Sequence, residues 1–132
     1  MVLLILLVLA LFVLQTFLPN RFRERPAAGG TSRLADSLGP RDDWRPLTGM
    51  GGRAERALAN MKEALPVFLA LALLNLFLGT GDLATAGATV FLVARVLYVP
   101  AYLAGIVGLR SLVWFASLVG LILMVVPILT RI

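Results

Sequence analysis

Three polar side chains within one apolar stretch are spaced so that they can share one face of a helix. In RAERALANMKEALPVFLALALLNL, residues 53–76, the residues Arg56, Asn60 and Glu63 follow the spacing i, i+4, i+7. At about 100° per residue they fall within about 60° of arc, and a rise of about 1.5 Å per residue spreads them over roughly 10 Å. Charged and amide groups are costly in such apolar surroundings, so we interpret this row as the lining of a site.

A second polar row has a matching period. Arg95, Tyr98 and Tyr102 are spaced i, i+3, i+7, again within about 60° of arc on a helix. If the two helices run in opposite directions, Glu63 and Arg95 reach similar depths, and we predict an ion pair between them. Such pairs also serve simply to join helices, so a packing role stays open at this point.

Further arginines are expected at the open end of these two rows. Arg53 and Arg56 precede the apolar part of their helix, and Arg110 lies in a short turn, GIVGLRS, that follows the second row. Arginine presents several donors in a fixed fork that suits carboxylates and other anions. The pattern therefore predicts a polar cleft that takes an anionic ligand.

The composition sets the surroundings of this cleft. Hydrophobic residues make up 60% of the 132 residues and charged residues only 14%, with a mean hydropathy of +0.94. A soluble domain of this length could not bury so much apolar surface, so we predict an integral membrane protein. The chain has no cysteine and no histidine, which removes disulfides, thiolate nucleophiles and the usual metal ligands, and no metal site is expected.

The hydropathy pattern predicts an all-α, four-helix transmembrane bundle in one domain, residues 1–132. The expected helices cover about 2–18, 53–78, 83–107 and 111–130, and residues 19–52 form a long loop rich in proline and glycine. A cleaved signal peptide is the alternative for the first run, but basic residues follow that run and none precedes it. Asn75 is expected to bond between helices, and Gly105, Gly108 and Gly120 to permit close helix contacts.

Basic residues indicate the orientation. Of the twelve Lys and Arg residues, eight lie between residues 21 and 56, between the first two apolar segments. This is typical of a topology signal rather than of an arm that binds nucleic acid. We therefore expect the 19–52 loop, Arg110 and the polar cleft at the cytoplasmic side, with both termini outside.

These residues resemble the two signatures of the MAPEG family, the membrane-associated proteins in eicosanoid and glutathione metabolism. RAERALANMKE is similar to the family's R-x-x-x-N-x-x-E pattern, and RVLYVPAYLAGIVGLRS is similar to its second signature. The helix layout and the length agree as well, so the resemblance covers nearly the whole chain. It implies a homotrimer that holds glutathione between neighbouring protomers at the cytoplasmic side.

The resemblance also implies roles for single residues. Arg110 matches the arginine proposed to stabilise the glutathione thiolate and is the candidate catalytic residue; a cationic neighbour lowers the pKa of a thiol. Arginines, a carboxylate and hydroxyls complement the two carboxylates and the amine of glutathione. The residues implied to contact the tripeptide, as a co-substrate, are Arg56, Asn60, Glu63, Arg95, Tyr98 and Tyr102.

Two positions separate this chain from the prostaglandin E synthase branch of the family. That branch has an arginine where this chain has Ala59, and a tyrosine where this chain has Trp114. The pattern is more similar to the bacterial branch, which resembles microsomal glutathione transferase, and this implies a bacterial inner membrane as the location. The expected function is thiol transfer, or peroxide reduction, on lipophilic electrophiles that enter from the membrane lipid.

Two other functions are compatible with four apolar helices. One is a non-catalytic membrane scaffold of the same fold, or a protein that only binds an anionic small molecule. The other is a small multidrug transporter. Transporters of that class resemble one another in having a carboxylate in their first helix, and residues 2–18 contain none, so the sequence disfavours this alternative.

Overall fold

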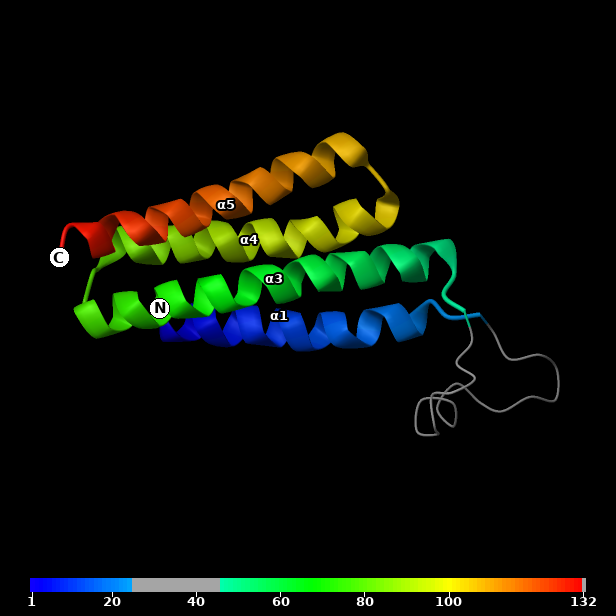
Figure 1. The fold of residues 1–132 in the computed structure, drawn as a ribbon, viewed down its shortest axis with the longest axis horizontal. Helices are drawn as coiled ribbons and strands as arrows, with labels where there is room; N and C mark the ends of the chain where they lie inside the picture. The colour runs from blue at the N-terminus through cyan, green and yellow to red at the C-terminus, as the bar shows by residue number, and fades with distance from the viewer. Residues whose placement is uncertain (25–45, 132) are drawn as a thin grey trace.

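The chain forms a bundle of long helices that run alternately up and down (Figure 1). The computed structural model describes residues 1–24 and 46–131, and each helix in this part is long and apolar enough to cross a membrane. The protein is thus an all-α, four-helix integral membrane bundle, as predicted. The helices are α1 (Val2–Arg21), α3 (Gly49–Leu78), α4 (Asp82–Ala104) and α5 (Val107–Leu129).

Helix ends differ from the sequence-based expectation where local capping decides them. α3 begins at Gly49 rather than near residue 53 because the Thr48 hydroxyl accepts a hydrogen bond from the Gly51 amide at 3.2 Å. α4 ends at Ala104, before the expected residue 107, because Gly105 takes a left-handed conformation with φ 74°. Most of the predicted 19–52 loop, residues 25–45, lies outside the described residues.

The two ends of that loop are tied together beside the start of α3. The Thr48 amide donates to the Phe22 carbonyl at 3.0 Å, and the Glu24 amide donates to the Pro46 carbonyl at 3.3 Å. Gly51 is buried here, and a Cβ atom on it would lie 2.7 Å from the Phe22 carbonyl oxygen. These contacts bring the end of α1, with Arg21, beside the first turn of α3, and Arg53 and Arg56 follow within the next turn.

The core lies in the middle of the bundle. Phe68 of α3 stacks on Phe91 of α4, with ring centroids 4.6 Å apart and planes within 12°. The amide of buried Asn75 donates to the Met124 carbonyl of α5 at 2.9 Å, which confirms the predicted bond between helices. Other side chains with no exposed surface complete this core, among them Val8 and Ala88.

Small residues let α4 and α5 pack with their backbones in contact. A Cβ atom on Gly120 would lie 2.7 Å from the Phe91 amide nitrogen, and one on Gly87 would lie 2.7 Å from the Gly120 carbonyl oxygen. The predicted close contact at Gly120 is therefore confirmed. The same prediction was wrong for Gly108, which has no atom within 4 Å of its Cβ position, and Gly105 serves as a helix cap instead.

Replacing Gly120 by alanine is expected to destabilise the bundle by about 1–3 kcal/mol, because backbone atoms cannot move aside without separating the two helices. Unfolding in mixed detergent micelles measures the change. Gly108→Ala is the matched control, because its added methyl group meets nothing and alanine favours a helix. Equal stabilities of the two variants would contradict the close packing at Gly120.

Candidate functional site

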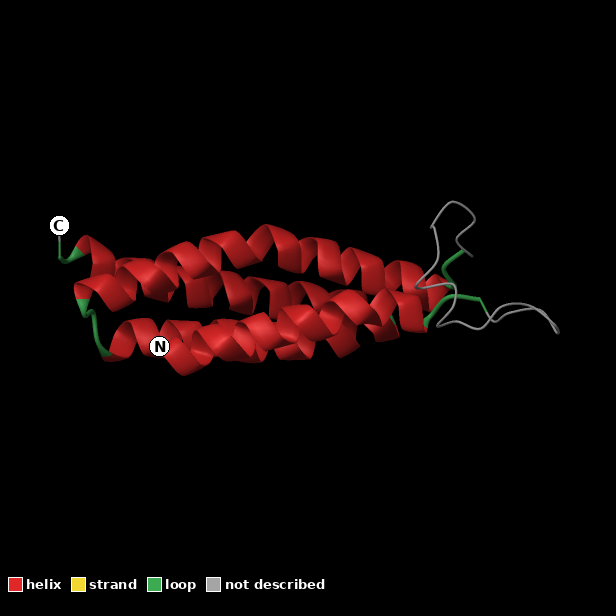
Figure 2. Cartoon of the chain, turned by 90° about the horizontal axis from the view of Figure 1, so that it is seen from below, coloured by secondary structure: helices red, strands yellow, loops and turns green. Residues whose placement is uncertain are grey.

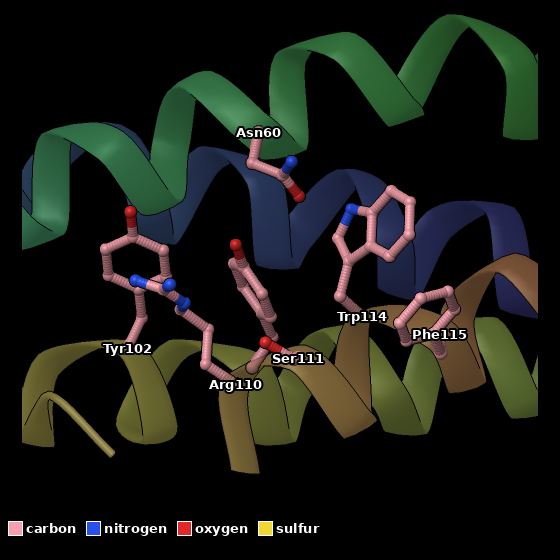
Figure 3. A pocket seen from close by; sticks show the side chains of 7 residues that line it. Asn60, Tyr102, Arg110, Ser111, Trp114 and Phe115 are labelled. Carbon is pink, nitrogen blue, oxygen red and sulfur yellow. The ribbon is translucent and has the colours of Figure 1, made fainter. Parts of the chain in front are cut away.

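The two polar rows meet at the end of the bundle where α3 begins and α4 ends. Figures 1 and 2 show that the first turn of α3, the last turn of α4 and the first turn of α5 lie at this same end. α1 lies behind the site in Figure 3, and the residues that line the cavity there come from α3, α4 and α5. The up-and-down topology therefore brings together residues that are 50 or more positions apart, such as Asn60 and Arg110.

The deepest arginine of the site is held by an amide. Arg95 has only 4% of its surface exposed, and its Nη1 donates to Asn60 Oδ1 at 2.5 Å. Its Nε is also buried and has no hydrogen-bond partner among the described residues. The site thus contains a buried guanidinium with one donor satisfied by α3 and another still available.

The prediction of an ion pair between Glu63 and Arg95 was wrong within the described chain. Asn60 accepts the hydrogen bond from Arg95, and no ion pair joins Arg95 to Glu63 in the part of the chain that the structure describes. Glu63 lies almost one helical turn further along α3 on an exposed position, although it lines the same small cavity as Arg95. The side chain of α3 that binds Arg95 is therefore Asn60 and not Glu63.

A series of side-chain contacts runs from the buried Arg95 through two tyrosine rings to Arg110 near the end of the bundle. The Arg95 Cζ lies 5.5 Å from the Tyr98 ring centroid, and the Tyr98 and Tyr102 rings are 5.3 Å apart. At the far end, the Arg110 Cζ lies 5.0 Å from the Tyr102 ring centroid. Both arginines are therefore oriented by aromatic faces, contacts that hold a cation in place without neutralising it.

Two adjoining cavities are lined by these arginines and tyrosines. The larger has a volume of about 340 Å³ and the smaller about 190 Å³, and both are lined by Asn60 and Trp114. The larger volume falls within the usual range of about 300–1,000 Å³ for small-molecule sites. Its other lining residues are Tyr98, Tyr102, Arg110, Ser111 and Phe115 (Figure 3). The smaller cavity adds Glu63, Arg95 and Ser117 to apolar side chains.

Two predicted arginines lie outside these cavities. Arg56 is exposed on α3, and its Nη1 is 3.5 Å from the Cβ position of Gly52. Arg53 reaches the end of α4 instead, with its Nη1 3.6 Å from the Cβ position of Gly105. A cation at this place complements the negative end of the helix dipole. Within one chain, the structure therefore groups every predicted site residue except Arg56 around the cavities.

Sequence reasoning missed most of what α5 contributes. Ser111 and Phe115 line the larger cavity, and Ser117 lines the smaller one. A periodic signal was present, because Arg110, Trp114 and Ser117 are spaced i, i+4, i+7 and so share one helix face. Serine and aromatic residues are common in membrane helices, however, so this row is weaker than one that contains a carboxylate.

A larger hollow lies elsewhere on the described chain and has a different character. It has a volume of about 460 Å³ and lies between α4 and α5, with Leu97 and Leu112 among its lining residues. Thr89 is the one polar residue that lines it, and no charged residue does. A surface of this kind suits contact with lipid chains, and the candidate functional site is the smaller, arginine-lined pair of cavities.

The fold and the site together define a class, a four-helix membrane bundle with an arginine- and tyrosine-lined cavity at one end. The profile of the MAPEG family matches residues 1–130, and the chain belongs to this family. Searches of curated proteins and of solved structures found no significant match.

Proposed function

We propose that this protein is a membrane-embedded transferase or peroxidase that binds glutathione or a related thiol and acts on lipophilic electrophiles. The observation that carries the proposal is the position of Arg110. Its guanidinium is half-buried over the Tyr102 ring, at 5.0 Å, and lines a cavity of about 340 Å³ beside apolar rings. A cation at an apolar surface is suited to a thiolate that attacks an apolar partner.

The lining supports binding of an anionic tripeptide as well as its activation. Arg95 has a buried Nε that no residue in the described part of the chain binds, and Glu63 lines the same cavity. A carboxylate and an amine of a ligand therefore both find complementary groups. Arg110 would stabilise the thiolate. In transfer to a chloronitroarene, the thiolate sulfur forms a bond to the ring carbon, the carbon–chlorine bond breaks, and chloride leaves with the electron pair.

Exposed polar residues support assembly of several chains, which we propose is a homotrimer. Arg56 and Glu63 are both exposed on α3, and Glu63 lies about 21 Å from the start of the helix at a rise of about 1.5 Å per residue. A carboxylate this far along a membrane helix is costly next to lipid. A neighbouring protomer that covers α3 would remove this cost and would close the cavity with Arg56 inside it.

The basic residues of the described chain support the orientation that we propose. Arg21, Arg53, Arg56 and Arg110 lie at the end of the bundle that contains the cavities, whereas the other end has Asp82 and, among the described residues, one arginine, Arg131. Positively charged loops stay on the cytoplasmic side of a membrane. The thiol would therefore enter from the cytoplasm while the electrophile enters sideways from the lipid.

Glutathione binding and conjugation of chlorodinitrobenzene by the purified protein in detergent test the proposal. Arg56→Ala and Glu63→Ala are each expected to weaken glutathione binding by tenfold or more, because each removes a charged partner of the ligand. Arg131→Ala, at the opposite end of the bundle, is the control and is expected to bind normally. Native mass spectrometry checks that each variant is still a trimer.

Three outcomes decide between the hypotheses. No thiol binding by the unaltered protein would contradict the proposed function. Glutathione binding without turnover of chlorodinitrobenzene or of a hydroperoxide would favour the alternative, a membrane protein that only binds an anionic small molecule. Binding and turnover that both decline in the two α3 variants would support the transferase.

A further inference from the structure

The two walls of the larger cavity differ in chemistry (Figure 3). Tyr102 and Arg110 stand at one side, Trp114 and Phe115 stand at the other, and Asn60 projects between them from α3. The polar wall accounts for the thiol in the proposed function. In that account the aromatic wall supplies only an apolar surface, and the kind of molecule that binds to it is still to be identified.

The aromatic wall leaves ring surface uncovered. Trp114 and Phe115 meet edge to face, with centroids 5.1 Å apart and planes at 79°. Trp114 is 37% exposed and Phe115 is 58% exposed. An edge-to-face contact covers at most one face of either ring, so a face of the Trp114 ring stays available to a planar ligand that stacks on it.

The indole of Trp114 also presents an unused donor. Its Nε1–H makes no hydrogen bond to any residue in the described part of the chain, and Figure 3 shows the indole nitrogen on the side of Asn60. A ligand that covers this N–H must offer it an acceptor, because an indole N–H that is buried without a partner is costly. Trp114 lines both cavities, so a ligand in either one can supply the missing acceptor.

The position of Trp114 relative to Arg110 suits a reaction between two bound partners. The two residues are four positions apart on α5, so their side chains are neighbours on one face, separated by about 6 Å along the axis. A ring stacked on the indole would therefore lie beside a thiolate held at Arg110. The geometry fits a planar electrophile better than a flexible one.

We propose that Trp114 is a substrate-binding residue that selects planar, electron-poor electrophiles with a hydrogen-bond acceptor, such as nitroarenes and quinones, over aliphatic ones. The inference rests on the proposed thiol transfer. Stacking on the electron-rich indole favours an electron-poor ring, and the Nε1–H donates to a nitro or carbonyl oxygen. An aliphatic alkenal offers no ring face and gains at most the hydrogen bond.

The first experiment compares two substrates in the purified, detergent-solubilised protein. In Trp114→Ala, the ratio of kcat/KM for chlorodinitrobenzene to kcat/KM for a medium-chain alkenal is expected to decrease about tenfold. Trp114→Phe keeps a ring face but loses the donor, and should recover part of the ratio. Leu112→Ala, on the lipid-facing hollow, is the control and should leave the ratio unchanged. An unchanged ratio in Trp114→Ala would overturn the proposal.

A second experiment needs no thiol and no turnover. The chain has two tryptophans, so Trp44→Phe leaves Trp114 as the single tryptophan, whose emission can be excited apart from that of the tyrosines. Unreactive 1,3-dinitrobenzene is expected to quench this fluorescence in a saturable way, whereas nitrocyclohexane, which has the acceptor but no flat ring, should bind at least tenfold more weakly. Tryptophan octyl ester in the same detergent reports collisional quenching, which does not saturate.

The two experiments separate the two proposals. Linear quenching that matches the ester control would overturn the role of Trp114, even if glutathione conjugation is intact. Saturable quenching in a protein that binds no glutathione would instead contradict the thiol transferase and leave the planar-ligand site standing. Saturable quenching together with the altered substrate ratio would support both.

Discussion

Replacing Arg110 by alanine is expected to lower kcat for glutathione conjugation by about 10²–10³-fold, the usual cost of removing one group that stabilises developing or bound charge. Arg110 makes a cation–ring contact with Tyr102 at 5.0 Å and no hydrogen bond through its side chain to a described residue. Its donors are thus available to a bound thiolate. Stopped-flow measurement of conjugation, with enzyme in excess, gives the rate of the chemical step.

The control variants for Arg110 separate charge from shape. Arg110→Lys keeps the positive charge without the planar fork, so it should retain more activity than Arg110→Ala. Arg131→Ala removes an arginine at the other end of the bundle and should react at the normal rate. If Arg110→Ala binds glutathione and conjugates it as fast as the unaltered protein, Arg110 has no catalytic role.

Replacing Asn60 by leucine is expected to destabilise the bundle by about 2–3 kcal/mol. The substitution removes the acceptor of the 2.5 Å bond from Arg95 and leaves a guanidinium that is only 4% exposed without its partner. Hydrogen bonds to charged groups are worth about 1.5–3 kcal/mol, and neutral pairs in membrane helices are worth about 0.6 kcal/mol on average. Unfolding in mixed micelles measures the loss.

A double-mutant cycle tests whether the loss comes from the unpaired cation. Asn60→Leu combined with Arg95→Met removes both partners and should be more stable than Asn60→Leu alone. Glu63→Gln removes the charge of the other candidate partner, which forms no ion pair with Arg95 within the described chain; its effect should be smaller than that of Asn60→Leu. A larger loss in Glu63→Gln than in Asn60→Leu would contradict the assignment of Asn60 as the partner of Arg95.

The sequence predicts the fold well because lipid leaves few options for a chain of this composition. In lipid, long apolar runs must form helices to satisfy their backbone hydrogen-bonding groups. The sequence contains four such runs. The ends of the helices were less predictable. The start of α3 depends on a hydroxyl cap at Thr48, and the end of α4 depends on the left-handed conformation of Gly105.

The candidate site was predictable in its location and less so in its contacts. Periodicity alone placed Asn60 with Arg95, Tyr98 and Tyr102, and the structure brings these residues together. It did not show that Arg95 bonds to Asn60 rather than to Glu63. That choice depends on the rotation of α3 against α4, which is set by packing such as the stack of Phe68 on Phe91. The contribution of α5 was not predicted, because the residues with which it lines the cavities are mostly serine and aromatic residues, which are common in membrane helices.

The central claim is that this cavity binds a thiol and holds it as a thiolate. Ultraviolet difference absorbance of the unaltered protein, titrated with glutathione at neutral pH, tests this claim most directly, with S-methylglutathione as the blank. The account predicts a saturable thiolate band that is lost in Arg110→Ala. A titration that shows no thiolate band at any glutathione concentration would contradict it.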